Sequence, residues 1–129
     1  MYGYYLSQEE NKEVKNYGAQ LETIYNQQTK KLEKILSICE LCPQYGQKSF
    51  YGKAKIIETE TGRYLLSYET IICSLSYGGT FIKYWDGYSV TTMKHIQAFF
   101  AFVRWPSGGK SWWTGLEAGK EYDYSNIVS

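Results

Sequence analysis

The sequence of 129 residues predicts a single α+β domain, and three observations carry this prediction. The N-terminal third has apolar residues at helical spacing, the middle alternates short β-type runs with turn residues, and a second helical stripe follows these runs. We expect residues 1–43 to form a helical arm, residues 44–104 to form a core of sheet plus helix, and residues 105–129 to form a loop and tail rich in Gly and Trp.

The predicted N-terminal helix begins at Ser7, because Ser7 and Glu10 fit a capping box. A 3–4 spacing then places apolar side chains on one face: Val14, Tyr17, Leu21, Ile24, Tyr25, Leu32, Ile35, Leu36 and Cys39. Over residues 8–40 this helix would be about 50 Å long, which exceeds the roughly 36 Å expected for a globule of this size. Either it breaks near Gly18 or residues 26–28, or its seam pairs with a second chain. We favour the long helix, and therefore a homodimer with Gln28 at the seam.

Four β-type runs follow, at residues 53–59, 64–68, 70–76 and 80–85, and turn residues separate them. They predict an antiparallel meander of three or four strands. Ser89 or Thr91 then caps a helix whose apolar stripe would pack on the sheet: Met93, Ile96, Phe99, Phe100 and Val103. We expect the aromatic tail after Trp105 to be irregular.

Composition and charge exclude several classes of protein. With 43% hydrophobic and 21% charged residues, the chain is not a disordered one. A net charge of +1 and a pI near 7.6 disfavour non-specific coating of DNA. The sequence has neither an apolar run of about 20 residues nor the features of a secretion signal, so we expect a cytoplasmic protein without a membrane partner and with free thiols.

Tyrosine is the unusual residue, with 14 copies beside 4 Trp and 5 Phe. Tyr suits half-buried strands, but it also gives a large and stiff contact area on binding surfaces. The excess therefore indicates a recognition face. Near the Gly-rich loop we select five residues as partner contacts: Trp112, Trp113, Arg104, Lys110 and Tyr88.

The start of the second helix carries a polar cluster that would suit an anion: Ser89, Thr91, Thr92, Lys94 and His95. Capping of the helix explains most of this cluster more simply. No catalytic set emerges, because His95 is the single histidine and has no Ser or Cys partner nearby in sequence. We therefore expect a protein that is not an enzyme.

Four residues would in principle supply zinc ligands: Cys39, Cys42, Cys73 and His95. Only Cys39 and Cys42 form a close pair, whereas structural zinc sites usually offer two such pairs. We expect no metal and no cofactor, and whether the four residues meet around zinc stays open at this point.

Two segments carry a family resemblance. Residues 67–72, Ser-Tyr-Glu-Thr-Ile-Ile, and residues 84–99, from Tyr84-Trp85-Asp86-Gly87-Tyr88-Ser89 to Phe99, resemble a small uncharacterised domain of phage and mobile-element proteins with the pattern SYxT and then WxGYSxTTxxHIxxF. The resemblance covers about residues 50–103. It implies a viral or prophage setting and no particular reaction.

These observations lead to two hypotheses of function. The first is a non-enzymatic phage or mobile-element protein that binds a host macromolecule, such as an inhibitor of a host defence complex of the anti-CRISPR kind, with aromatic anchors. The alternative is a module for single-stranded nucleic acid, in which sheet tyrosines stack on bases and five basic residues follow the backbone: Lys48, Lys53, Lys55, Arg63 and Lys83. The alternative requires these basic residues and the tyrosines to share one side of the sheet.

Overall fold

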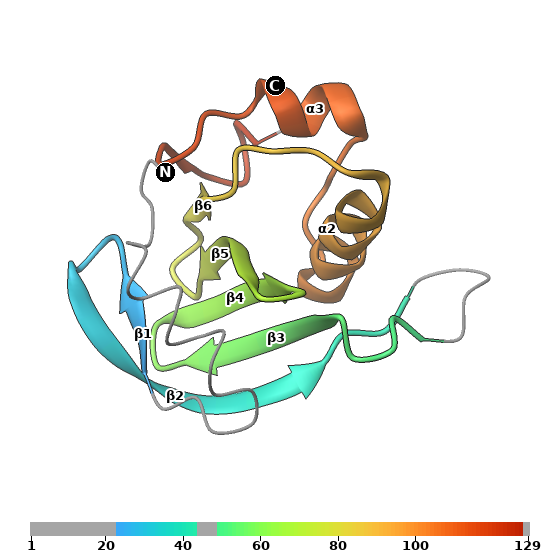
Figure 1. Cartoon of the computed structure of the whole chain (residues 1–129). Helices are drawn as coiled ribbons and strands as arrows, with labels where there is room; N and C mark the ends of the chain where they lie inside the picture. The colour runs from blue at the N-terminus through green and yellow to red at the C-terminus, as the bar shows by residue number, and fades with distance from the viewer. Residues whose placement is uncertain (1–22, 44–48, 128–129) are drawn as a thin grey trace.

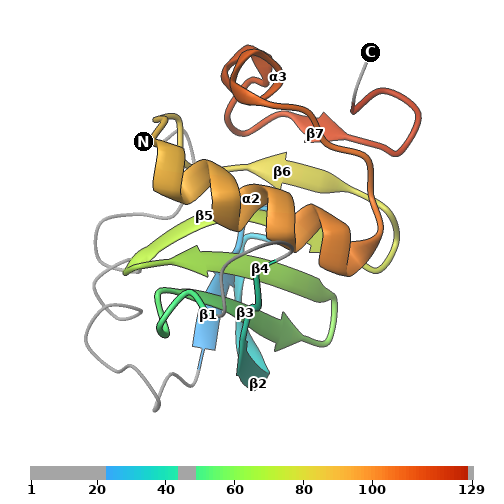
Figure 2. The same ribbon diagram turned by 90° about the vertical axis from the view of Figure 1, so that its right-hand side faces the viewer.

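A curved antiparallel sheet of seven strands dominates the computed structural model, which describes residues 23–43 and 49–127 (Figure 1). The strands lie in the sheet in chain order: β1 Thr23–Asn26, β2 Lys31–Glu40, β3 Ala54–Thr59, β4 Gly62–Ser67, β5 Thr70–Ser76, β6 Phe81–Lys83 and β7 Glu121–Tyr122. The described residues also form two helices, α2 Val90–Val103 and α3 Lys110–Gly115. The sheet curls into a half-barrel, and Figure 2 shows α2 lying across one face of it.

The predicted N-terminal helix is wrong for the part that the structure describes. Residues 23–26 and 31–40 form β1 and β2, which pair antiparallel with Thr23 opposite Lys34. The predicted portion over residues 8–22 lies outside the described residues. The helical seam around Gln28 is therefore absent from the described chain, and the homodimer stays a prediction without that seam as its basis.

Asn26 shows why the helical spacing misled. Its side-chain Oδ1 accepts hydrogen bonds from the backbone N–H groups of Gln28 (2.8 Å) and Thr29 (3.1 Å). An Asn that bonds to its own backbone in this way favours a turn over a helix. The turn closes with Lys30 at a φ of 59°, whose N–H donates to the Asn26 carbonyl at 2.7 Å. Polar residues 26–30, which fit the outer face of a helix, are the loop between two strands.

The predicted fold class is wrong, although several of its elements form near the segments where the sequence predicts them. Strands β3 to β6 fall within or close to the four β-type runs, and α2 begins directly after its cap. Ser89 is the N-cap, because its Oγ accepts the N–H of Thr92 at 3.0 Å. The helix ends at Arg104, which adopts a φ of 63° in the left-handed region. The predicted meander of three or four strands is wrong because β1, β2 and β7 extend it.

The sheet buries side chains on both faces. Adjacent residues of a strand point to opposite faces, so Ile56 packs toward the helices whereas Ile57 packs on the other face. The helix-side core joins Leu65 and Phe81 of the sheet to Ile96 and Phe99 of α2. The opposite core gathers Ile24, Ile35, Ile57, Tyr64, Leu66, Ile71, Ile82 and Tyr84.

The tail after Trp105 is more regular than predicted. It contains α3, and β7 pairs with β6 so that Tyr122 lies opposite Phe81. Trp113 and Leu116 of this segment are buried in the helix-side core. Among the described residues, no helix combines the length and the apolar character needed to cross a membrane.

Candidate functional site

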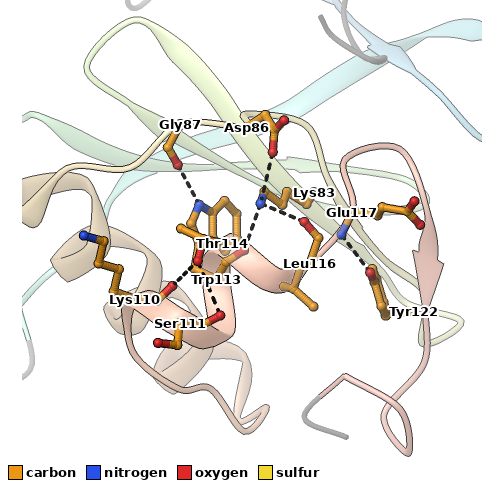
Figure 3. A network of polar contacts seen from close by, with 10 residues as sticks. All are labelled: Lys83, Asp86, Gly87, Lys110, Ser111, Trp113, Thr114, Leu116, Glu117 and Tyr122. Atoms are coloured by element: carbon orange, nitrogen blue, oxygen red, sulfur yellow. Dashed lines mark hydrogen bonds and ion pairs between the residues drawn. The ribbon is translucent and has the colours of Figure 1, made fainter.

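Trp113 and Lys83 belong to a buried network and are not available for contact (Figure 3). The Lys83 ammonium donates to the carbonyls of Trp113 (2.8 Å) and Leu116 (2.9 Å), and it lies 3.4 Å from Asp86 Oδ1. The Trp113 indole N–H donates to the carbonyl of Gly87 at 3.0 Å. Both residues are 0% exposed. Burial lowers the pKa of Lys83, while Asp86 opposes this shift. Trp113 is therefore too buried to contact a partner, and Lys83 is too buried to follow a nucleic-acid backbone.

The other predicted contact residues lie at the surface. Arg104 and Lys110 are exposed, and Lys110 Nζ lies 5.0 Å from the ring centroid of the half-buried Tyr88. Trp112 is half-buried, and its indole N–H donates to the carbonyl of Ile127 at 2.7 Å. This contact fixes the indole and leaves only part of it accessible.

A cleft of about 430 Å³ lies beside Trp112. Its lining combines apolar and polar side chains from α3 and the tail: Ser111, Trp112, Gly115, Leu116, Lys120, Tyr122, Asn126 and Ile127. The cleft lies within the size range of ligand pockets. Trp112, unlike Trp113, therefore lines a cleft that is open to solvent.

The residues of the predicted anion site do not converge on a ligand position. Ser89 caps α2, Thr92 and His95 are buried, and Thr91 and Lys94 are exposed. The Ser89 hydroxyl already accepts the N–H of Thr92, which an anion at the helix start would use. Capping therefore accounts for Ser89, while Thr92 lies beside Ser67 in the interior.

His95 has a serine partner that sequence proximity did not reveal. Ser67 Oγ, at the end of β4, lies 2.7 Å from His95 Nδ1, and Thr92 Oγ1 lies 3.5 Å from the same Ser67 oxygen. Burial lowers the pKa of His95, so the ring is neutral near pH 7. Ser67 and His95 are only 2% and 1% exposed, so a substrate would not reach this pair. The contact ties α2 to the sheet.

The potential zinc ligands remain apart. Cys39 and Cys42 are exposed near the end of β2, whereas Cys73 lies in the helix-side core and His95 is bonded to Ser67. Within residues 23–43 and 49–127, no group of three His, Cys, Asp or Glu side chains is arranged to hold a metal ion. Burial raises the pKa of both Cys39 and Cys73, which disfavours thiolate chemistry at either residue.

Two tyrosines in or next to strands of the sheet, Tyr64 and Tyr84, are buried. Tyr64 and Tyr84 lie in the core opposite the helices, and burial raises the pKa of both phenols. Arg63 directly precedes Tyr64 in β4, and Lys83 is the last residue of β6, directly before Tyr84, so both basic side chains point to the helix side. Lys48 lies outside the described residues. Tyr64 and Tyr84 are therefore too buried to stack on bases, and binding of single-stranded nucleic acid stays a prediction.

Two exposed tyrosines instead occupy tight turns at one end of the sheet. Tyr51 is 76% exposed with a φ of 55°, and Gly52 follows it with a φ of 75°. The N–H of Lys53 donates to the carbonyl of Phe50 at 3.0 Å, which closes the turn. Two central residues with positive φ are typical of a type I′ turn, in which Asn-Gly is strongly preferred. Tyr51 thus stands where the backbone favours Asn.

Tyr68 repeats this arrangement in the neighbouring turn. It is the first of two residues that connect β4 to β5, it is 50% exposed, and its φ is 57°. Positive φ at the first central position alone is the type II′ pattern, where Gly is usual. Its N–H donates to the carbonyl of Lys53 at 2.6 Å, so the two turns are bonded to each other. We call Tyr51, Lys53 and Tyr68 the tyrosine surface.

Side-chain contacts hold the Tyr68 ring in place. Lys53 Nζ lies 5.4 Å from its centroid, and the centroid of the His95 ring lies 5.7 Å from it. Sequence reasoning missed Tyr51 and Tyr68 as contact residues. The available signal was local, since a Tyr-Gly pair and a two-residue connection between β-type runs both mark tight turns.

One comparison with known proteins gives a match. A family model described as a family of unknown function, DUF8033, matches residues 39–115. This segment spans more than half of the chain and contains β3 to β6, both described helices and the whole tyrosine surface. The comparisons with curated proteins and with solved structures found no match.

Proposed function

Because the chain belongs to the DUF8033 family, whose function is unknown, we propose a function from its own structure: a non-catalytic protein that binds a partner protein through the tyrosine surface. The observation that carries this proposal is the pair of exposed tyrosines in turns that favour Asn or Gly. A bulky residue with positive φ costs roughly 1–2 kcal/mol. Backbone strain of this kind concentrates at functional positions.

The chemistry of the surface supports a protein partner. Tyrosine contributes a large amphipathic contact area with few rotatable bonds, and it is enriched among interface residues that dominate binding. The turns fix the backbone of both tyrosines, and Lys53 and His95 also hold the Tyr68 ring before the partner arrives, which lowers the conformational entropy lost on binding. Lys53 adds one positive charge over Tyr68.

Two further features support a non-catalytic role and a host protein as the partner. The buried Ser67–His95 pair offers no accessible nucleophile, which supports a non-catalytic role. The resemblance to phage and mobile-element domains, which includes Tyr68, motivates a host protein as partner. We propose a host defence complex as the first class to test.

The test is affinity capture from a lysate of the host with the full chain as bait. We expect wild-type protein to retain a defined protein, and the Tyr51→Asn, Tyr68→Gly double variant to retain at least about tenfold less of it. Leu36→Ser is the matched control, because it removes an exposed apolar side chain from β2 (55% exposed) outside the tyrosine surface. Its retention should equal that of wild type.

Both proteins and nucleic acids in the captured fraction are identified. Equal retention by the double variant and wild type would exclude the tyrosine surface as the contact. Capture of nucleic acid alone would favour the alternative function. Thermal unfolding of each variant is measured in parallel, so that lost binding is not confused with lost folding.

A further inference from the structure

A second cluster of aromatic and basic side chains lies on the helix side of the sheet, near the start of β4. The guanidinium carbon of Arg63 lies 5.4 Å from the ring centroid of Tyr77 and 5.4 Å from that of Phe102. The three residues come from β4, from the connection after β5 and from the last turn of α2. We call them the Arg63 surface. Tyr68 follows the other end of β4, so this surface is separate from the tyrosine surface.

Arg63 is held in a fixed orientation. Its Nε–H donates to Glu58 Oε2 at 2.9 Å, and the other oxygen, Glu58 Oε1, accepts the hydroxyl of Ser37 at 3.0 Å. The bond from Arg63 lowers the pKa of Glu58, so the carboxylate stays ionised at neutral pH. The backbone of Tyr77 is anchored as well, because its N–H donates to the Thr61 carbonyl at 2.8 Å.

The outer edge of the guanidinium remains available. In the part of the chain that the structure describes, Arg63 makes one hydrogen bond, through Nε, and none through Nη1 or Nη2. Its side chain is 32% exposed, while Tyr77 and Phe102 are 57% and 49% exposed. Glu58 accepts from Arg63 through Nε alone and accepts from Ser37 with its other oxygen, so it leaves the Nη edge unoccupied. A planar guanidinium with two free, parallel N–H donors matches a carboxylate.

We propose that the Arg63 surface binds an acidic segment of a partner protein, in which one carboxylate accepts from the Nη groups and an adjacent apolar side chain packs on Tyr77 and Phe102. Charge complementarity selects the carboxylate, and the exposed rings select a peptide over a free anion. Arg with neighbouring aromatic residues is a composition typical of interface hot spots. This interaction does not depend on the tyrosine surface.

The probe is a blocked peptide that alternates phenylalanine with aspartate, titrated into the full ¹⁵N-labelled chain. We expect saturable shifts of the Arg63 Nε–Hε resonance and of the amides of Tyr77 and Phe102. The same peptide with asparagine in place of aspartate should bind about tenfold more weakly, and so should Arg63→Gln with the original peptide. Arg63→Lys keeps the charge but not the two parallel donors, so it should also bind more weakly than wild type.

Lys120→Gln is the charge-matched control, because it removes one exposed positive charge elsewhere and should bind the peptide like wild type. Equal binding of the aspartate and asparagine peptides, or of Arg63→Lys and wild type, would overturn the proposal. Equally tight binding of inorganic phosphate at the same resonances would also overturn it, since the site would then be a general anion site. Tyr51→Asn, Tyr68→Gly should leave peptide binding unchanged, so the two proposals succeed or fail separately.

Discussion

Tyr51 and Tyr68 occupy backbone conformations that Asn or Gly adopts at lower free energy. The strain is local, because each tyrosine lies in a turn closed by hydrogen bonds between backbone groups. Gly62 shows the opposite case, in which the residue present is the only one that fits. Gly62 therefore stabilises the fold, whereas Tyr51 and Tyr68 reduce its stability.

Tyr51→Asn should raise the free energy of unfolding by about 0.5–1 kcal/mol, because Asn is preferred at the first central position of a type I′ turn. Urea unfolding followed by far-UV circular dichroism measures the change. Tyr51→Phe, which keeps the strain, is the control and should match wild type. A loss of stability in Tyr51→Asn would show that the ring contributes to folding and would weaken the functional interpretation of this turn.

Gly62→Ala should lower the free energy of unfolding by about 2 kcal/mol or more. A Cβ at Gly62 would lie 2.4 Å from the carbonyl oxygen of Leu75 and 2.6 Å from the Cα of Ser76, and the backbone of the paired strand has little freedom to move. Gly115→Ala is the matched control, since a Cβ there meets no atom within 4 Å. If both variants were equally stable, the close approach of β4 and β5 would be wrong.

At the scale of elements, buried polar contacts add to apolar packing in holding both described helices on the sheet. Lys83 of β6 binds two carbonyls at the end of α3, a position where a positive charge also complements the helix dipole. Ser67 of β4 binds His95 of α2. Each contact is buried, so its loss leaves a polar group without a partner in an apolar setting.

Lys83→Met should destabilise the protein by about 2–3 kcal/mol, because the carbonyls of Trp113 and Leu116 lose their donor while the apolar volume is kept. Hydrogen exchange should accelerate first in α3. Lys120→Met, at an exposed lysine, should change stability by less than about 0.5 kcal/mol. Unchanged exchange in α3 of Lys83→Met would show that apolar packing alone holds this helix.

Stability should fall as the pH drops below about 6.5, because burial lowers the pKa of His95 from its ordinary value of 6.5. Above this pH the ring is neutral in both states and its contribution is constant. Below it, the unfolded chain binds a proton that the folded chain takes up only at lower pH. Thermal midpoints from pH 8 to 5 should fall more steeply for wild type than for His95→Asn. Parallel curves would show that other groups cause the dependence.

At the scale of the whole molecule, two cores share one sheet. The helix-side core and the opposite core use alternate residues of the same strands, as Ile56 and Ile57 show. Neither face can lose its packing without disturbing the strands that support the other. We therefore expect the described fold to unfold as one cooperative unit.

Ile57→Val and Ile96→Val test this expectation from opposite faces. Each removes one methylene group from a fully buried position and should cost about 1 kcal/mol, or a fall of roughly 3–6 °C in the midpoint. Circular dichroism and tryptophan fluorescence should report the same midpoint in each variant. Separate transitions for the two probes would show that the cores unfold independently.

The sequence alone determined the elements whose signals are local: strands β3 to β6, bounded by turn residues, and α2, for which it offered Ser89 or Thr91 as the cap. The apolar spacing of residues 23–40 fitted a helix, and only the pairing of β2 with β3 and the side-chain hydrogen bonds of Asn26 decided for strands. Backbone partners that are distant in sequence leave no local signal. The candidate sites depended on tertiary structure for the same reason. Burial excluded Trp113 and Lys83 as contact residues, and long-range contacts joined Ser67 to His95 and Arg63 to Phe102. Backbone conformation distinguished Tyr51 and Tyr68 from the other tyrosines that the structure describes.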